Sequence, residues 1–153
     1  MKPLLILHAG DAHGTTTLLV DAFSEGARSA EPALPQRRVP ALTASADVLL
    51  DAGAVLFATP EKFGYMAGAL KHYFDRSFYQ LEGRVAGLGY VLLVSAGNDG
   101  RGAVDSVQRI LRGLALKPLA EPLRVTGPPT PADLDAAREL GAAIAAGLVF
   151  GIF

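Results

Sequence analysis

The chain has 153 residues, a net charge of −1 at pH 7 and 50% hydrophobic residues. This length predicts a single domain, 1–153, with a sizeable core, and the near-neutral charge offers no basic surface for nucleic acid. The absence of cysteine excludes disulfides, zinc–thiolate sites and cysteine nucleophiles.

In chain order, apolar runs alternate with segments of helical periodicity. Residues 2–8 form an apolar run that suits a strand buried on both faces. Further strands are expected at 36–42, 53–58, 88–95 and 119–126, and helices at 15–30, 43–50, 66–81, 103–116 and 131–148. Pro40 and Pro122 cannot donate to a sheet ladder, so the second and fifth strands are expected at or near an edge.

This alternation predicts an α/β fold: a flavodoxin-like, doubly wound sheet of five parallel strands in the order 2-1-3-4-5, with helices on both faces. The apolar stretches at 2–8 and 141–153 are too short to cross a bilayer, and the first lacks a small-residue cleavage site. We therefore expect a cytoplasmic protein with no membrane span. The apolar end, 148–153, suits burial in a partner subunit, which would make a homo-oligomer, or packing under the chain's own sheet; both stay open.

Three glycine-containing loops follow the first, third and fourth strands: 9–17, 59–66 and 95–102. Because the carboxyl ends of parallel strands meet at one edge, these loops should lie together where open α/β sheets bind ligands. The first loop precedes a helix, whose free N–H groups and dipole favour an anion such as phosphate. Asp11 would repel a dianion unless it points away. An ordinary capped turn explains the same loop, and that alternative stays open.

The second and third loops have a composition that can hold a flat polar ring. Backbone N–H groups near 61–65 can bond ring carbonyl and nitrogen atoms, and Phe63 and Tyr65 can cover an aromatic face. Three glycines of the third loop leave space beside a ring. The alternatives are that the aromatic residues pack the loop against the core and that the glycines serve turn geometry.

The motif Thr59-Pro60-x-x-Phe63-Gly64-x-Met66-x-Gly68-x-Leu70-Lys71, followed by Asp75-Arg76, resembles the second flavin loop and following helix of the NAD(P)H-dependent FMN reductase family. The quinone reductases with flavodoxin-like folds share it. The stretch Val94-Ser95-Ala96-Gly97-Asn98-Asp99-Gly100-x-Gly102 resembles the third flavin loop of that family. The resemblance covers nearly the whole chain in element order. It implies FMN, with its phosphate at the first loop and its isoalloxazine ring at the other two.

Carried over by position, the resemblance assigns the cofactor contacts. Phosphate contacts fall on His13, Gly14, Thr15 and Thr16. Ring contacts fall on Thr59, Pro60, Glu61, Lys62, Phe63, Gly64, Tyr65 and Met66, and on Ser95, Ala96, Gly97, Asn98, Asp99, Gly100 and Gly102. No side chain is assigned to catalysis, because the flavin carries the chemistry. The first loop departs from the family pattern, since the usual hydroxyl residue at its start is missing and Asp11 is present.

Other interpretations of the fold lack their motifs. A dinucleotide-binding Rossmann domain needs G-x-G-x-x-G after the first strand, and the glycines of the first loop have the wrong spacing. A receiver domain needs an aspartate at the end of the third strand, and a serine hydrolase needs a G-x-S-x-G elbow. His8, Asp11 and His13 are a sterically conceivable metal site, although a strand end and loop support explain the two histidines more simply.

Two functions of different classes stay open. The first is an enzyme that passes hydride from NAD(P)H to bound FMN and on to a small-molecule acceptor such as a quinone or free flavin. The second is a flavodoxin-like FMN-binding electron-transfer module with no NAD(P)H activity of its own. The near-neutral charge disfavours the second, because carriers usually meet their partners through complementary potential.

Overall fold

The computed structural model describes residues 1–153. Its elements are β1 (Leu4–His8), α1 (Thr15–Ala30), β2 (Gln36–Pro40), the 3₁₀ helix η1 (Ala46–Asp51), β3 (Ala54–Lys62), β4 (Tyr65–Met66), α2 (Gly68–Leu81), β5 (Gly89–Ala96), α3 (Arg101–Gly113), β6 (Lys117–Pro118), β7 (Leu123–Thr126) and α4 (Pro131–Val149). Every expected strand and helix has a counterpart. The largest differences are a longer third strand, the added strands β4 and β6, and a shorter fifth strand.

The strand order confirms the predicted doubly wound sheet. β2 pairs with β1, β1 with β3, and β3 with β5, all in parallel. Of the strand predicted at 119–126, only β7 (Leu123–Thr126) is formed, and β6 (Lys117–Pro118) lies just before the predicted range; each pairs separately with β5. Pro122 lies in the break between them, where a residue without an N–H cannot extend the ladder. The second and fifth strands are the two edges of the parallel sheet, as Pro40 and Pro122 predicted.

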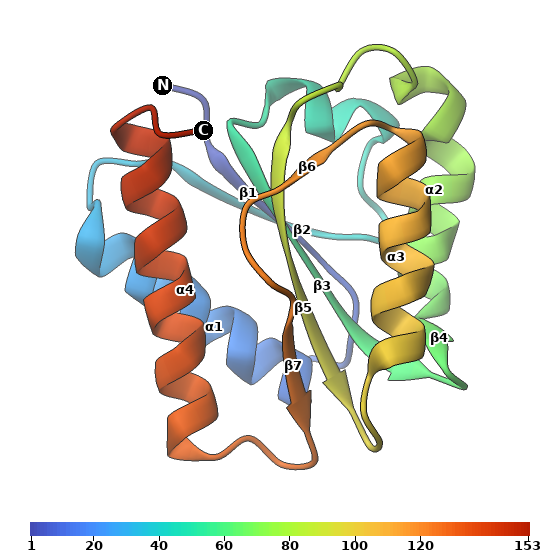
Figure 1. Cartoon of the computed structure of the whole chain (residues 1–153), viewed down its shortest axis with the longest axis vertical. Helices are drawn as coiled ribbons and strands as arrows, with labels where there is room; N and C mark the ends of the chain where they lie inside the picture. Colours follow the sequence, from blue (N-terminus) through green and yellow to red (C-terminus); the bar gives the residue numbers. More distant parts are fainter.

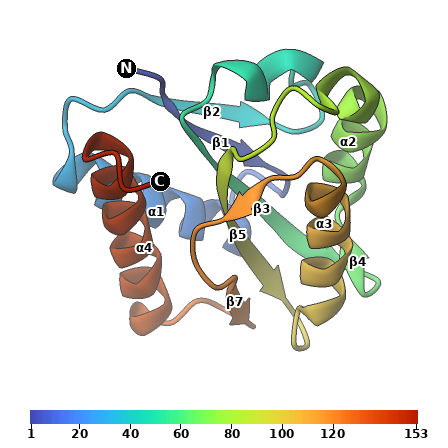
Figure 2. The ribbon, with the colours of Figure 1, turned by 45° about the horizontal axis from the view of Figure 1, so that its top comes forward.

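Side chains of the central strands alternate between two cores, as the two-residue period of a strand requires. On β3, Val55 and Phe57 belong to one core, whereas Ala54, Leu56 and Ala58 belong to the other. The first core lies between the sheet and α2, α3 and η1, and the second lies between the sheet and α1 and α4 (Figure 1, Figure 2). The sheet is therefore covered on both faces.

Two glycines bring α1 and α4 into close contact. A Cβ on Gly26 would overlap the backbone carbonyl of Arg138, and a Cβ on Gly141 would overlap that of Phe23. The Ala- and Gly-rich composition of α4 thus allows the two helices to pack at backbone distance on one face of the sheet (Figure 2).

Both ends of α4 are capped within the chain. Thr130 Oγ1 accepts the N–H of Asp133 at 3.2 Å, and the Asp133 carboxylate accepts the N–H of Thr130 at 2.8 Å, which forms a capping box. At the other end, the Ile152 N–H donates to the Gly147 carbonyl at 2.9 Å, which closes a Schellman turn. The Phe153 ring then lies against Gly147. The end of the chain folds back on its own helix.

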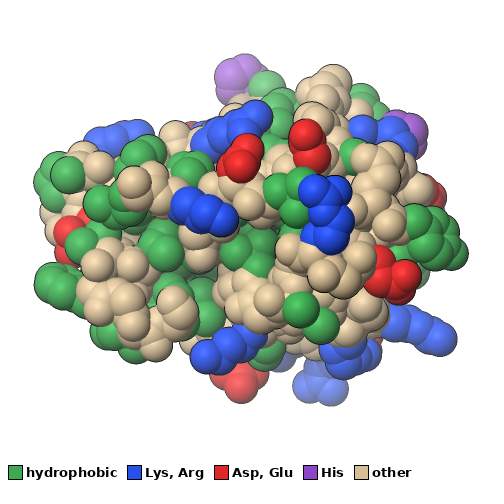
Figure 3. All heavy atoms as spheres, turned by 90° about the horizontal axis from the view of Figure 1, so that it is seen from above, with side chains coloured by type: hydrophobic (Ala, Val, Ile, Leu, Met, Phe, Trp, Pro, Cys, Tyr) green, Lys and Arg blue, Asp and Glu red, His purple; other side chains and the backbone are tan.

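The rim that carries both chain ends lies opposite the carboxyl ends of the parallel strands (Figure 1). Seen from that side, Lys and Arg side chains are interspersed with Asp and Glu rather than gathered in one patch (Figure 3). Hydrophobic side chains are numerous on the left of this view (Figure 3). Phe150 and Ile152, which follow α4, are exposed. None of the helices combines the length and apolar composition that crossing a membrane requires.

Candidate functional site

A cleft of about 520 Å³ opens at the carboxyl edge of the sheet. Its walls are the first loop with the start of α1, the residues that follow the sheet-forming part of β3 with the start of α2, the end of β5, and the turn after β7. The residues that line it are Gly10, Asp11, Gly14, Thr15, Thr16, Pro60, Glu61, Lys62, Ala67, Ala69, Ser95, Ala96, Gly97 and Gly127. Small-molecule sites span roughly 300–1,000 Å³, so the cleft has a suitable size.

The first loop presents the start of α1 to the cleft. Gly14 is the N-cap and has no side chain to offer, so the N–H groups of Thr15, Thr16 and Thr17 have no acceptor in the chain. The Asp11 carbonyl accepts the Gly14 N–H at 3.1 Å and the Thr17 hydroxyl at 2.7 Å, which folds the loop into a turn. The free N–H groups and the helix dipole make this end of the cleft attractive to a negatively charged group.

Two hydroxyl groups at the cleft bond to each other. Thr16 Oγ1 lies 2.6 Å from Ser95 Oγ, and both side chains are buried. The bond joins the first turn of α1 to the end of β5, although the two residues are 79 positions apart. Thr16 and Ser95 thus hold two walls of the cleft together.

The second predicted loop is a β-hairpin in the structure. β3 continues beyond the parallel sheet to Lys62 and pairs antiparallel with β4, which places Glu61 opposite Met66. Phe63 and Gly64 form the two-residue turn, with φ values of +54° and +69°. Two positive φ values are typical of a type I′ turn, whose twist matches that of the flanking strands. The Phe63 side chain at the tip is fully exposed.

The hairpin is anchored to the two helices beneath it. Thr59 Oγ1 accepts the N–H of Ala67, the N-cap of α2, at 3.0 Å. A backbone N–H of β4 donates to Ser106 Oγ on α3 at 3.0 Å. Gly102, in the first turn of α3, lies so close to the tip that a Cβ there would overlap the Gly64 carbonyl. The position of the tip is therefore set by α3.

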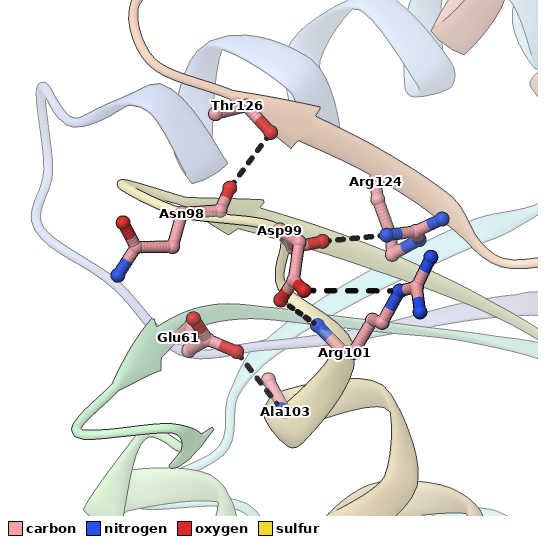
Figure 4. Close-up of polar contacts among 7 residues, drawn as sticks. All are labelled: Glu61, Asn98, Asp99, Arg101, Ala103, Arg124 and Thr126. Atoms are coloured by element: carbon pink, nitrogen blue, oxygen red, sulfur yellow. Dashed lines mark hydrogen bonds and ion pairs between the residues drawn. The ribbon is translucent and has the colours of Figure 1, made fainter.

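One carboxylate from the hairpin and one from the third loop cap the start of α3 (Figure 4). Asp99, in the third loop, accepts the N–H of Arg101 at 3.0 Å. Glu61, in the hairpin, accepts the N–H of Ala103 at 3.2 Å. These bonds satisfy N–H groups that a helix start leaves free, and the negative charges complement the helix dipole. The start of α3 is thus occupied by the chain itself, unlike the start of α1.

Strand β7 holds the third loop from the other side. Arg124 Nη1 donates to the Asp99 carbonyl at 2.7 Å, and Thr126 Oγ1 donates to the Asn98 carbonyl at 2.8 Å. Figure 4 shows the Asn98 side chain pointing away from this group of residues. The third loop is therefore fixed by its backbone between β7 and α3.

The structure brings about half of the predicted contact residues into the cleft lining. Those that line it are Gly14, Thr15, Thr16, Pro60, Glu61, Lys62, Ser95, Ala96 and Gly97. Those outside the lining are His13, Thr59, Phe63, Gly64, Tyr65, Met66, Asn98, Asp99, Gly100 and Gly102. Within the second group, Thr59 and Met66 are buried beneath the hairpin, whereas Phe63 and Tyr65 are exposed on it.

Five lining residues were absent from the predicted contacts: Gly10, Asp11, Ala67, Ala69 and Gly127. Gly127 follows β7, so the rule that ligands bind at the carboxyl ends of strands could have included it. Ala67 and Ala69 lie at the start of α2, where their small side chains leave the cleft open. No local pattern distinguishes them from the other alanines of the chain.

The cleft has three charged side chains: Asp11, Glu61 and Lys62. His8 ends β1 just before the first loop, and burial, with a contribution from Arg38, lowers its pKa, so it is neutral at pH 7. No three His, Asp or Glu side chains are grouped so that they could hold a metal ion. His8, Asp11 and His13 do not form such a group.

A comparison with protein families identifies the chain's relatives. The family model described as NADPH-dependent FMN reductase matches residues 17–123, which is more than half of the chain. The chain belongs to the NADPH-dependent FMN reductase family. The match includes the hairpin, the start of α2 and the third loop, and it begins at Thr17, after most of the first loop.

Solved structures show the same fold at low sequence identity. A flavodoxin from the domain Archaea superposes with a TM-score of 0.80 at 18% identity, over 95% of this chain and 98% of that one. Flavodoxin 1 from Bacillus cereus gives 0.79 at 17% identity, over 94% of this chain and 97% of that one. The flavodiiron protein from Giardia intestinalis superposes with a TM-score of 0.80 at 19% identity. That match covers 97% of this chain but only 36% of the flavodiiron protein. The fold of this member of the FMN reductase family is therefore flavodoxin-like.

The cleft has the features that a flavin needs. One end is bounded by Pro60, Ala67 and Ala69, and Gly97 borders open space, because a Cβ there would meet no atom within 4 Å. Its other end presents the free N–H groups at the start of α1. For a member of the FMN reductase family, the residues present thus fit a flat ring at one end and an anion at the other.

Proposed function

We propose that the protein is an FMN-binding oxidoreductase that passes electrons from NAD(P)H to a small-molecule acceptor, such as a quinone or free flavin. The observation that carries this proposal is the cleft, where the three predicted loops meet at the edge of a flavodoxin-like sheet. Membership of the NADPH-dependent FMN reductase family supports the same activity.

In this proposal, the walls of the cleft divide the binding of FMN between them. The N–H groups at 15–17 hold the phosphate, and the residues 60–62 and 95–97 border the isoalloxazine ring. Phe63 and Tyr65, which were predicted to contact the ring, are exposed outside the lining and can instead contact the acceptor or the nicotinamide. Bound FMN supplies the ability to accept two electrons from a nicotinamide and release them to the acceptor.

The chain's own groups provide the electrostatic setting. Lys62 is the only cation among the residues that line the cleft, and it is exposed at the hairpin. Together with the backbone N–H groups, it supplies positive potential that favours negative charge in the cleft. Glu61 offsets little of this potential, because its carboxylate is directed to the start of α3.

Flavin titration followed by reduction tests the proposal. FMN fluorescence should be quenched on addition of protein, and anaerobic NADPH or NADH should then bleach the flavin absorbance rapidly. Regeneration of the absorbance by a quinone would complete the cycle. A folded protein that leaves FMN fluorescence unchanged at saturating concentration would contradict the proposal.

A flavodoxin-like electron-transfer module is the second candidate. The similarity to two flavodoxins along almost their whole length favours it. The same reduction assay separates the two functions. Bleaching by dithionite or a partner reductase, but not by NADPH or NADH, would favour the carrier.

A further inference from the structure

The end of the cleft formed by the first loop lacks a positively charged side chain. The residues that line it there are Gly10, Asp11, Gly14, Thr15 and Thr16, of which only Asp11 is charged. The two histidines nearest in sequence do not compensate. His8 is half-buried with a lowered pKa, and His13 is exposed and outside the lining.

Most hydroxyl groups of this end already have partners. Thr16 Oγ1 is bonded to Ser95 Oγ, and Thr17 Oγ1 donates to the Asp11 carbonyl. Thr15 is the one threonine of the three whose hydroxyl has no partner in the chain. A phosphate group placed here is therefore left with backbone N–H groups and one hydroxyl.

Two opposing effects act on such a phosphate. The start of α1 attracts it, and this attraction is modest for a solvent-exposed helix end. Asp11 lines the same end of the cleft, with its Cβ 3.6 Å from the place where a Cβ on the N-cap Gly14 would lie. Its exposed carboxylate opposes a phosphate there through a partly solvated medium. The family match begins at Thr17, so it gives no support to residues 9–16 as a phosphate-binding loop.

We propose that Asp11 is a specificity-determining residue that removes most of the preference of the cleft for a phosphorylated flavin. The cleft then binds flavin mainly through its ring and accepts riboflavin, which lacks the phosphate, with an affinity within about tenfold of that for FMN. This inference rests on the proposed function, because it concerns the same cleft and the same class of ligand.

Fluorescence titration of wild-type protein with FMN and with riboflavin gives the first test. The ratio of the riboflavin Kd to the FMN Kd should be below about ten. A ratio well above ten overturns the inference and leaves the proposed function standing. Quenching of neither flavin overturns both.

The variant Asp11→Asn gives the second test, because it removes the charge and keeps the size of an exposed side chain. FMN should bind about fivefold more tightly, and riboflavin affinity should stay within about twofold of wild type. The matched control is Glu31→Gln, which makes the same charge change at the far end of α1 and should alter neither Kd. Equal FMN affinity in wild type and Asp11→Asn overturns the inference.

His13→Ala addresses the histidine within the first loop. Because His13 lies outside the cleft lining, the ratio of the two Kd values should not change. A selective loss of FMN affinity in His13→Ala would make His13 the partner of the phosphate and overturn the inference.

Discussion

Among single residues, Gly97 offers the most direct test of the cleft. It lines the cleft, and an added Cβ would meet no atom within 4 Å. Gly97→Leu should therefore fill the ring end of the cleft and weaken FMN binding at least about tenfold. The unfolding free energy should stay within about 0.5 kcal/mol, since the new side chain displaces only solvent.

Ala86→Leu provides the control for Gly97→Leu. Ala86 is exposed, and it precedes β5 at the rim opposite the cleft. A leucine there adds similar apolar bulk and should leave FMN affinity unchanged in the same fluorescence titration. Unaltered FMN binding by a folded Gly97→Leu protein would show that the flavin lies elsewhere.

Burial of Tyr73 makes the unfolding free energy depend on pH in the alkaline range. Its side chain is fully buried, its hydroxyl donates to the Ala46 carbonyl at 3.2 Å, and burial raises its pKa to about 12. An unfolded tyrosine has a pKa of about 10. Between about pH 10 and 12 the unfolded chain therefore loses a proton that the folded chain keeps, so stability falls as pH rises.

Tyr73→Phe should remove this part of the pH dependence. At neutral pH the variant should be about 1 kcal/mol less stable, because the Ala46 carbonyl loses its partner. Above pH 10 the unfolding free energy of the variant should decline less steeply with pH than that of wild type. The two slopes should differ by up to about 1.4 kcal/mol per pH unit. Urea unfolding at several pH values measures both effects. Tyr79→Phe, at an exposed position, should match wild type, and parallel curves for wild type and Tyr73→Phe would refute the assignment.

At the scale of elements, the contact between α1 and α4 depends on small residues. A Cβ at Gly141 would overlap the Phe23 carbonyl, so Gly141→Ala should push the helices apart and destabilise the protein by about 1–3 kcal/mol. Gly68→Ala is the matched control, since Gly68 is in the first turn of α2 and a Cβ there would meet nothing. That change should be neutral or stabilising by up to about 1 kcal/mol. Thermal unfolding of both variants measures these stability changes. Equal changes in Gly141→Ala and Gly68→Ala would rule out the close contact between the helices.

The hairpin of β3 and β4 is an element that the sequence did not predict. The parallel strands follow from apolar runs, and the strand order follows from their alternation with helices. The pairing of β3 with β4 depends instead on a turn with two positive φ values, one of them at Phe63. Phenylalanine rarely takes that conformation, so Phe63-Gly64 is a weak signal for a hairpin.

The position of the cleft could be predicted from the sequence, but only some of the contacts that form it could. The rule for carboxyl ends of strands located it, and the glycines marked its loops. The bond between Thr16 and Ser95, and the capping of α3 by Glu61, join residues far apart in the sequence. Such contacts depend on the packing of three separate walls, and no local pattern contains them.

For the whole molecule, the two cores make the centre of the sheet the most protected region. β1, β3 and β5 are paired on both sides and buried on both faces, whereas β2 and β7 each have one partner strand. Native-state hydrogen exchange should therefore be slowest for bonded amides of β3 and β5. It should be faster for β2 and β7, and equal protection of β7 and β3 would contradict this hierarchy.

The close approach of Gly102 to Gly64 has a consequence for engineering. A side chain at Gly102 would overlap the backbone of the hairpin, and one at Gly64 would be strained by the φ of +69°, so a mutagenesis library should leave both codons untouched. Tyr65 is exposed beside the same tip and can be randomised, whereas the positive φ at Phe63 favours glycine, asparagine or aspartate there. Selection of such a library on alternative oxidants would explore new chemistry along the mouth of the cleft while the scaffold stays intact.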